Sequence, residues 1–394
     1  MLLALTLVVQ SPAASAPTPS VSTPAPEVVV TGERLKKIHD QCRQGKCTPL
    51  RDAQASIAWA ESQFREGRYV DAKNTLRDAS GRAKRYAATD PKPAAAVFEA
   101  HATISWQEGD QDVYRDAVAR RVRTLRDHLP PDDPHVRAAA LALGDMWMRL
   151  NEPMEAERAY ARTEREAVDA GQGDVAIRAR LARARVRKML GDRTDALALL
   201  ASAGSLPGGD GAAARGAIQA MRLRFATEDG DDAAIARAAD ELRAGGLTRP
   251  VLLWAPPYPE TATQIREGAR DLALGLGGSD AVGDRHSTAA DITGIQWADI
   301  GFWIRPDGRT ADIEVLRSSY QSGWTAPYMG QIARRRYAAS AGAPGDPGTY
   351  RIERFTLRGN YQVPKNSLIR RRAGATKLEV LDLTDSAARV TARR

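Results

Sequence analysis

Two cysteines that lie close together are among the residues of the chain that could do chemistry. Cys42 and Cys47 enclose Arg-Gln-Gly-Lys, follow His39 closely, and are the only cysteines in 394 residues. In an exported chain, such a pair is typical of a small local disulfide, and a pair of free thiols is the alternative. With His39 these residues supply three potential ligands, one too few for the usual zinc site. The CxxCH motif of covalent haem attachment is absent. We therefore predict a disulfide between Cys42 and Cys47.

The remaining acid–base and metal-binding residues are scattered. Neither HExxH nor GxSxG occurs, and Asp132, Asp133 and His135 share a proline-rich turn that is typical of a solvated loop. The five histidines are His39, His101, His128, His135 and His286. We predict no enzymatic activity, no cofactor and no metal.

The composition is that of a globular protein with a large core. Hydrophobic residues make up 43% of the chain and charged residues 27%, and the formal net charge is +8. The basic residues are mostly arginines interleaved with Asp and Glu, whereas nucleic-acid binding needs basic residues gathered on one face. We expect no nucleic-acid partner, and the length favours two domains.

The first residues, MLLALTLVVQSPAASAP, have a short apolar run and then Ala14-Ser15-Ala16. This pattern is typical of a secretory signal cleaved near Ala16, and the run is too short to span a bilayer. No Lys or Arg precedes the run, so either the start codon is assigned too late or the signal is atypical. A disordered cytoplasmic tail is the alternative. A signal at residues 1–16 predicts a periplasmic protein without a transmembrane helix.

A linker should follow the signal. Residues 17–27 are rich in Pro, Ser and Thr, and we extend this linker to residue 49, including the cysteine loop. Within it, EVVVTGERL at 27–35 resembles the sequence near the mature N-terminus of many TonB-dependent outer-membrane receptors. A short β-prone segment that ends at Gly32 is the plain alternative.

Residues 50–245 are Ala-rich and helical in period, and a turn signal recurs along them. Each copy has a Gly or Asn, then an acidic residue, then the start of another helix. The marker residues are Gly67, Gly109, Asn151, Gly191 and Gly230, with spacings of 42, 42, 40 and 39. A steady period of this size indicates a solenoid of helical hairpins, with an irregular bundle as the alternative. Small residues five positions later, Ala72, Ala156 and Ala196, should let two helices pack closely.

These repeats resemble the tetratricopeptide family. The resemblance lies in Gly67-Arg-Tyr69-x-x-Ala72, Pro153-x-x-Ala156 and Gly191-Asp-x-x-x-Ala196. That family has about 34 residues per repeat, so longer helices or linkers must absorb the surplus here. The resemblance implies a surface that binds protein partners.

The last part of the chain changes period. Ile300, Phe302 and Ile304 alternate with other residues before Pro306-Asp307-Gly308, and a second alternating run follows, which indicates a β-hairpin. Residues 322–338 have Trp324, Tyr328 and Ile332 on one helix face, and residues 350–361 form a third strand. The predicted order is β-β-α-β, with the helix on one face of an antiparallel sheet.

This order resembles the C-terminal domain of the TonB energy-transducer family over about residues 255–361. The matching residues are Pro257–Glu260, Ile304-x-x-Asp307-Gly308-Arg309, Val315–Ser319, Arg334–Tyr337 and Phe355-x-Leu357. The membrane helix and long proline-rich spacer of that family are missing, and about 37 residues separate the entry from the hairpin. The resemblance implies a kept fold and a lost force-transmitting role.

In that family the last strand pairs with an extended segment of a receptor. The resemblance therefore implies a partner-binding edge strand at Arg351, Glu353, Phe355 and Leu357. The alternative is an edge blunted by its own charges, Arg351, Glu353, Arg354 and Arg358.

The predicted fold class is α+β, a helical-hairpin solenoid followed by a small antiparallel β-β-α-β domain. The predicted divisions are a signal peptide at 1–16, a linker at 17–49, repeats at 50–245, a TonB-like domain at 250–361 and a basic tail at 362–394. We predict a periplasmic, non-enzymatic interaction protein with a TonB-like docking domain, whose partner is an envelope protein such as a TonB-dependent receptor. Two alternatives are a scaffold whose C-terminal domain is only a cap, and a glycan-binding accessory protein using exposed Trp303 and Trp324.

Overall fold

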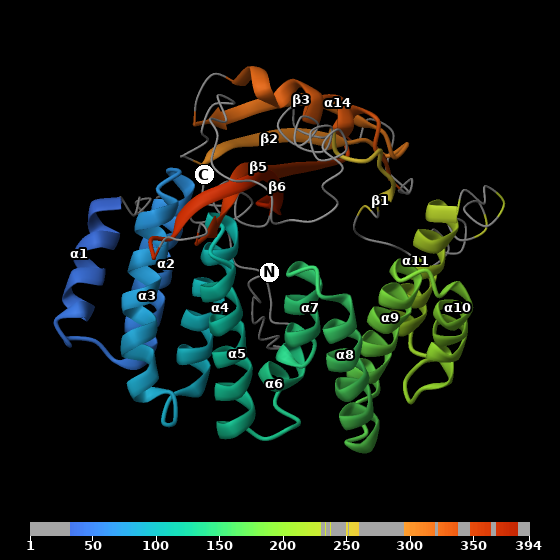
Figure 1. Cartoon of the computed structure of the whole chain (residues 1–394), viewed down its shortest axis with the longest axis horizontal. Helices are drawn as coiled ribbons and strands as arrows, with labels where there is room; N and C mark the ends of the chain where they lie inside the picture. Colours follow the sequence, from blue (N-terminus) through green and yellow to red (C-terminus); the bar gives the residue numbers. More distant parts are fainter. Residues whose placement is uncertain are drawn as a thin grey trace, which may run out of the picture.

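Helices stand side by side as antiparallel hairpins in a curved array, and a sheet lies across one end of them (Figure 1). This computed structural model describes residues 32–229, 252–259, 295–319, 322–337, 347–363 and 368–384, with single residues 233, 237 and 250. The helices of the array are α1 (Gly32–Arg43), α2 (Pro49–Arg65), α3 (Tyr69–Tyr86), α4 (Pro91–Glu108), α5 (Gln111–His128), α6 (Pro134–Ala139), α7 (Ala142–Arg149), α8 (Pro153–Asp169), α9 (Gly173–Met189), α10 (Arg193–Ser202) and α11 (Ala212–Asp229).

The predicted turn markers end the first helix of each hairpin. Gly67, Gly109, Asn151 and Gly191 have φ angles of 79°, 96°, 62° and 86°, the left-handed region that glycine and asparagine tolerate. The hairpins are α2–α3, α4–α5, α6/α7–α8 and α9–α10, which we number one to four. The helical-repeat prediction is confirmed for these four, and Gly230 lies outside the described residues.

Close helix packing explains the small residues after each marker. Ala72, Ala156 and Ala196 are each 0% exposed, as the sequence predicts. The third hairpin departs from the others because its first helix is broken into α6 and α7 near Ala140 and Leu141. The linker prediction is wrong in part, since α1 begins at Gly32 and occupies residues that we assigned to the linker.

The C-terminal sheet has the strand order β3-β2-β5-β6, and every neighbouring pair is antiparallel. Its strands are β2 (Gln296–Ile304), β3 (Thr310–Ser318), β5 (Thr349–Gln362) and β6 (Arg371–Asp382), with β1 (Leu252–Trp254) and β4 (Arg336–Tyr337) forming a separate pair. A short 3-10 helix, η2 (Ser322–Thr325), leads into α14 (Ala326–Ala333). The α+β fold class is confirmed.

The core of this domain follows the predicted alternation. Ile300 and Phe302 are fully buried and pack with Tyr328 and Ile332 of α14. The basic-tail prediction for 362–394 is wrong at its centre, because residues 371–382 form β6. Among the described residues, no helix has both the length and the apolar character needed to cross a bilayer. The predicted signal at 1–16 lies outside the described residues.

Candidate interaction surface

The predicted partner-binding edge strand is an interior strand of the sheet. Strand β5 pairs with β2 along one side and with β6 along the other, so its backbone groups already have partners. Phe355 and Leu357 are core residues, 0% and 5% exposed, and Glu353 accepts hydrogen bonds at 2.9 Å from buried Arg335. The edge prediction is wrong because the chain supplies the extra strand itself, from residues 371–382 within the predicted tail.

Arg354 joins the sheet to the first hairpin. Its side chain is 0% exposed and donates from Nε to Asp299 at 2.6 Å. Its other nitrogens donate to the last carbonyls of α2, at 2.6 Å to Phe64 and 3.1 Å to Arg65. The guanidinium also lies 4.2 Å from the ring centre of Trp297. Carbonyls at a helix C-terminus lack partners within the helix and carry partial negative charge, so a buried arginine is well matched to them.

Arg358 repeats this arrangement on the second hairpin. It is also 0% exposed and donates to the last carbonyls of α4, at 3.0 Å to Gln107 and 2.5 Å to Trp106. Glu379 of β6 supplies the carboxylate at 3.2 Å, and the ring of Trp106 lies 5.5 Å from the guanidinium. The sequence had suggested both arginines as exposed edge charges, and that alternative is wrong.

The helical repeat and the strand therefore match in spacing. The acceptors Arg65 and Gln107 are 42 residues apart, which is the repeat period, and the two donors are four residues apart on one face of β5. Four strand residues span about 13 Å. One strand thus caps two successive hairpins at equivalent positions.

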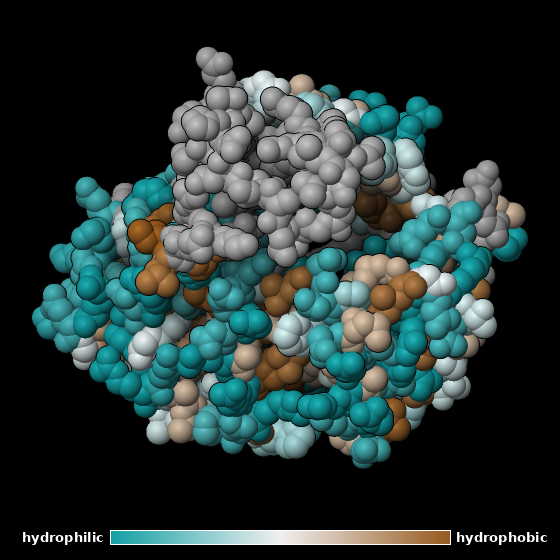
Figure 2. Space-filling view, viewed as in Figure 1, coloured by the Kyte–Doolittle hydropathy of each residue, from teal (hydrophilic) through white to brown (hydrophobic). Residues whose placement is uncertain are grey.

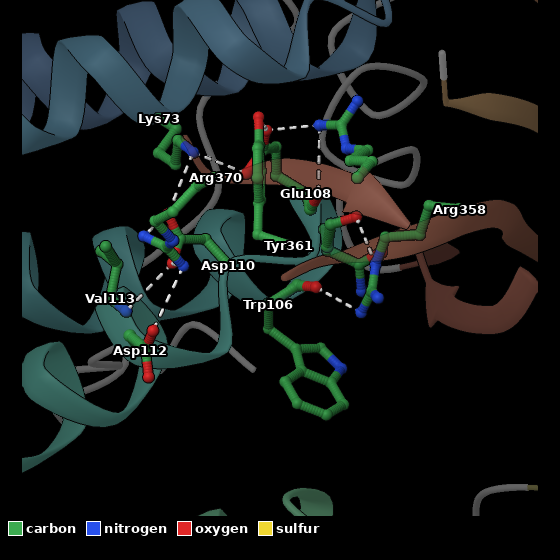
Figure 3. Close-up of polar contacts among 11 residues, drawn as sticks. Lys73, Trp106, Glu108, Asp110, Asp112, Val113, Arg358, Tyr361 and Arg370 are labelled. Carbon is green, nitrogen blue, oxygen red and sulfur yellow. Dashed lines mark hydrogen bonds and ion pairs between the residues drawn. The ribbon is translucent and has the colours of Figure 1, made fainter. Parts of the chain in front are cut away.

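A charged cluster holds the end of the β5–β6 hairpin against the turn between α4 and α5 (Figure 3). Lys73 lies 2.7 Å from Glu108 and 3.2 Å from Asp110, and Arg370 lies 2.9 Å from Asp110. Arg372 and the hydroxyl of Tyr361 donate to Glu108 as well. Burial alone would raise the pKa of Asp110, but the hydrogen bond from Arg370 and the charge of Lys73 outweigh it and lower that pKa. The cluster is a structural joint with its charges paired.

The sheet domain is also fixed at the other end of the array. Strand β1 pairs with β4 and packs on α11, where Thr227 donates to the carbonyl of Leu253 at 3.2 Å. The sheet is therefore anchored on hairpins one and two and again on α11, on either side of hairpins three and four (Figure 1).

Hairpins three and four keep apolar side chains in solvent at the same end of the array. Met154 and Met189 are each 54% exposed, and Leu190 and Leu197 are 41% and 42% exposed. Figure 2 shows pale-brown and brown atoms over the ends of α8 and α9. We call Met154, Met189, Leu190 and Leu197 the open turn surface. Large apolar residues gathered on a surface mark candidate interaction sites.

A cavity of about 390 Å³ lies between α5, α8 and the broken helix α6/α7. Its walls include Val136, Leu143 and Trp147, and Arg162 lies at its rim. Arg126 and Glu166, 2.7 Å apart, link α5 to α8 beside it. The cavity lies beside the break between α6 and α7, since Ala139 and Ala140 also line it.

The predicted chemistry-bearing residues do not converge. Cys42 and Cys47 form the predicted disulfide, which removes both thiols as metal ligands. His39 is buried, and that burial lowers its pKa. Among the described residues, no group of three His, Cys, Asp or Glu side chains could hold a metal ion. Asp133 instead caps α6, with its pKa lowered by the hydrogen bond from Lys92 and by the backbone N–H of His135.

The two tryptophans proposed for glycan binding are packed against other residues. Trp324 is half-buried against the sheet core and lies 5.8 Å from Tyr328 between ring centres. Trp303 is half-buried beside Tyr350, with 5.1 Å between ring centres. A stacking platform needs an exposed ring face, so this alternative loses its basis.

Comparisons with known proteins give structural likeness only. No family model matches the chain, and no curated protein sequence matches it. One similar structure is the Podosopora anserina putative kinesin light chain with nearly identical TPR-like repeats, at 15% identity and TM-score 0.38, covering 50% of this chain and 96% of that one. BtubC from P. vanneervenii has 14% identity and TM-score 0.42 over 59% of this chain and 94% of its own. A Rap protein complexed with competence and sporulation factor has 11% identity and TM-score 0.36, with coverage of 54% and 58%. Likeness at this level carries no argument about function.

Sequence reasoning missed the joint between array and sheet. Arg354 and Arg358 are separated by four residues, and so face one side of a strand that was already predicted. In the sequence that face looks solvent-exposed, because it lies opposite Phe355 and Leu357 and carries Thr356 between the two arginines. Their partners are main-chain carbonyls some 250 to 290 residues away. Side-chain patterns in the sequence do not indicate such partners.

Proposed function

We propose that this chain is a non-enzymatic protein-binding scaffold of the cell envelope, in which hairpins three and four bind the partner and the sheet domain is a fixed cap. The observation that carries the proposal is the contrast between successive hairpins. Strand β5 caps α2 and α4, and Gln107 near the end of α4 is only 4% exposed. Met189, at the same place in hairpin four, is 54% exposed. Met154 in hairpin three is also 54% exposed, and its counterpart Val70 in hairpin one is 45% exposed. Exposed apolar side chains at such an end favour burial against a second protein.

Docking of a receptor segment by the sheet domain has less support. The predicted strand at 351–357 is paired on both sides. Among the described residues β3 pairs only with β2, and Asp312 within it has a φ of 50°, a kink of the kind that blunts edge strands. The resemblance to TonB stays a hypothesis about the origin of this domain.

An envelope location has two supports. The first is the signal-like sequence at residues 1–16, and the second is the disulfide between Cys42 and Cys47, which fits an oxidising compartment. Fusion of alkaline phosphatase after residue 229 tests it, because that enzyme is active only after export. An inactive fusion would contradict the envelope location.

Site-specific photo-crosslinking in cells tests the scaffold function. A photo-reactive amino acid replaces Met189 in one strain and Val168 in the other. Val168 is 41% exposed and lies at the opposite end of α8, so it is a matched control. We expect one crosslinked protein band from position 189 that position 168 does not give. The same pattern from both positions would contradict the proposal.

A further inference from the structure

We propose that the open turn surface binds an extended partner segment that carries two arginines four residues apart, flanked by apolar side chains. This inference rests on the proposed scaffold function and names the chemistry of its partner. It follows from continuity with the joint already described, since β5 occupies the equivalent end of hairpins one and two.

The first argument is the position of the acceptors. Arg65 and Gln107 accept hydrogen bonds from Arg354 and Arg358, and their counterparts in hairpins three and four are Arg149 and Met189. Both counterparts end their helices, so their carbonyls have no partner within the helix. No side chain in the described part of the chain donates to either carbonyl. Within the described residues, the last carbonyls of α7 and α9 are thus free to accept hydrogen bonds of the kind that Arg354 and Arg358 donate to α2 and α4.

The second argument is charge. Asp110 follows its turn marker directly and binds Arg370, and the residues at the same place in hairpins three and four are Glu152 and Asp192. Glu152 is exposed and has no cationic partner within the described residues, and Asp192 is paired only loosely, at 3.6 Å, with Arg187. The surface therefore offers carboxylates to an incoming cation, as hairpin two does.

The third argument is the apolar rim. Two residues before its turn marker, hairpin two has Gln107, which is only 4% exposed beneath Arg358. In hairpin four Met189 and Leu190, at the end of α9, remain exposed. The flexible methionine side chain can pack against partners of different shapes, as it does at many protein-binding surfaces. An arginine-only ligand would leave these side chains in water, so the partner segment needs apolar residues as well.

The probe for this inference is a fluorescent peptide with the sequence of residues 349–362, TYRIERFTLRGNYQ, added to the full chain. It carries both arginines at the required spacing, and the β5 site is already filled by the chain itself. We expect saturable binding by fluorescence anisotropy. A peptide with alanine in place of both arginines should bind about tenfold more weakly or worse, because it loses charge-assisted hydrogen bonds.

Two protein variants locate the binding. Met189→Asp and Glu152→Lys should each weaken binding about tenfold, whereas Val168→Asp and Asp169→Lys at the far end of α8 should not. Both test residues are exposed, so the variants should fold, and circular dichroism checks this. The inference is overturned by no binding up to roughly 1 mM peptide, by equal binding of the alanine peptide, or by equal affinities of the test and control variants.

The outcome is separable from that of the crosslinking experiment. A crosslinked partner without peptide binding would keep the scaffold function and reject the arginine-bearing segment. Peptide binding at the open turn surface without any crosslinked partner would support the chemistry of the surface and reject the scaffold function in cells.

Discussion

Arg354 and Asp299 form an ion pair that is almost completely removed from solvent, with 2.6 Å between Nε and Oδ1 and side chains 0% and 2% exposed. The same arginine caps α2, so one residue ties the sheet to the helical array. This pair therefore lies at the contact between the C-terminal domain and the first hairpin.

Replacing Arg354 by alanine should therefore lower the free energy of unfolding by about 3 kcal/mol, because Oδ1 of buried Asp299 and the carbonyl of Arg65 lose their donor. Arg317 still donates to Oδ2 of Asp299, which limits the loss. Urea denaturation measures the loss. Arg351→Ala on the same strand is the control, because its pair with Asp382 is partly exposed and should contribute at most about 1 kcal/mol. Equal losses of stability in the two variants would contradict a larger contribution of Arg354 than of Arg351.

Two glycines with the same backbone conformation should differ in their response to substitution. Gly67 and Gly191 both have left-handed φ angles, 79° and 86°, so alanine strains both by about 1–2 kcal/mol. Only at Gly67 would the added methyl collide with the indole of Trp297, whereas nothing lies within 4 Å at Gly191. Gly67→Ala should thus lower the melting temperature more and change tryptophan fluorescence. Identical thermal shifts would show that the sheet does not rest on this turn.

Stability should depend on pH through His101. Burial, with help from the charge of Lys73, lowers the pKa of His101 from 6.5 to about 4. The unfolded chain binds the proton more readily, so this contribution is complete above about pH 6.5 and is lost as the pH falls towards 4, by about 3 kcal/mol in total. In His101→Gln this part of the slope should disappear.

Urea denaturation at several pH values between 4 and 7 checks this dependence. His128→Gln is the control, because His128 is exposed at the end of α5 and its loss should leave the slope unchanged. His39 also has a lowered pKa, so a smaller slope should remain in His101→Gln. An unchanged slope in that variant would contradict the assignment to His101.

The disulfide should stabilise the start of the array locally. Cys42 and Cys47 are five residues apart, and closing so short a loop is worth about 2 kcal/mol in the chain-entropy account. Replacing both by serine should speed hydrogen exchange in α1 and leave exchange in β5 unchanged. Reduction of the unaltered protein should have the same effect, and a global change in exchange would contradict a local role.

Much of the architecture was readable from the sequence. The markers Gly67, Gly109, Asn151 and Gly191 fixed the hairpins because few residues tolerate a left-handed turn. Alternation at Ile300, Phe302 and Ile304 fixed the core face of the sheet, since a strand has a period of two. Strand β6 was not predicted because it begins with two arginines and carries Lys377 and Glu379 among its few apolar residues. Its composition therefore resembles that of a charged tail.

Local propensity and periodicity thus determined the helices, their turns, the β-hairpin and the cysteine pair, because each depends on residues close together in the sequence. Tertiary structure alone decided that β6 would cover β5 and that Arg354 and Arg358 would cap α2 and α4. Those contacts join main-chain carbonyls to side chains far along the chain. Such contacts cannot be predicted from sequence patterns, because every residue has the same backbone carbonyl. These carbonyls nevertheless decide which charged side chains can be buried.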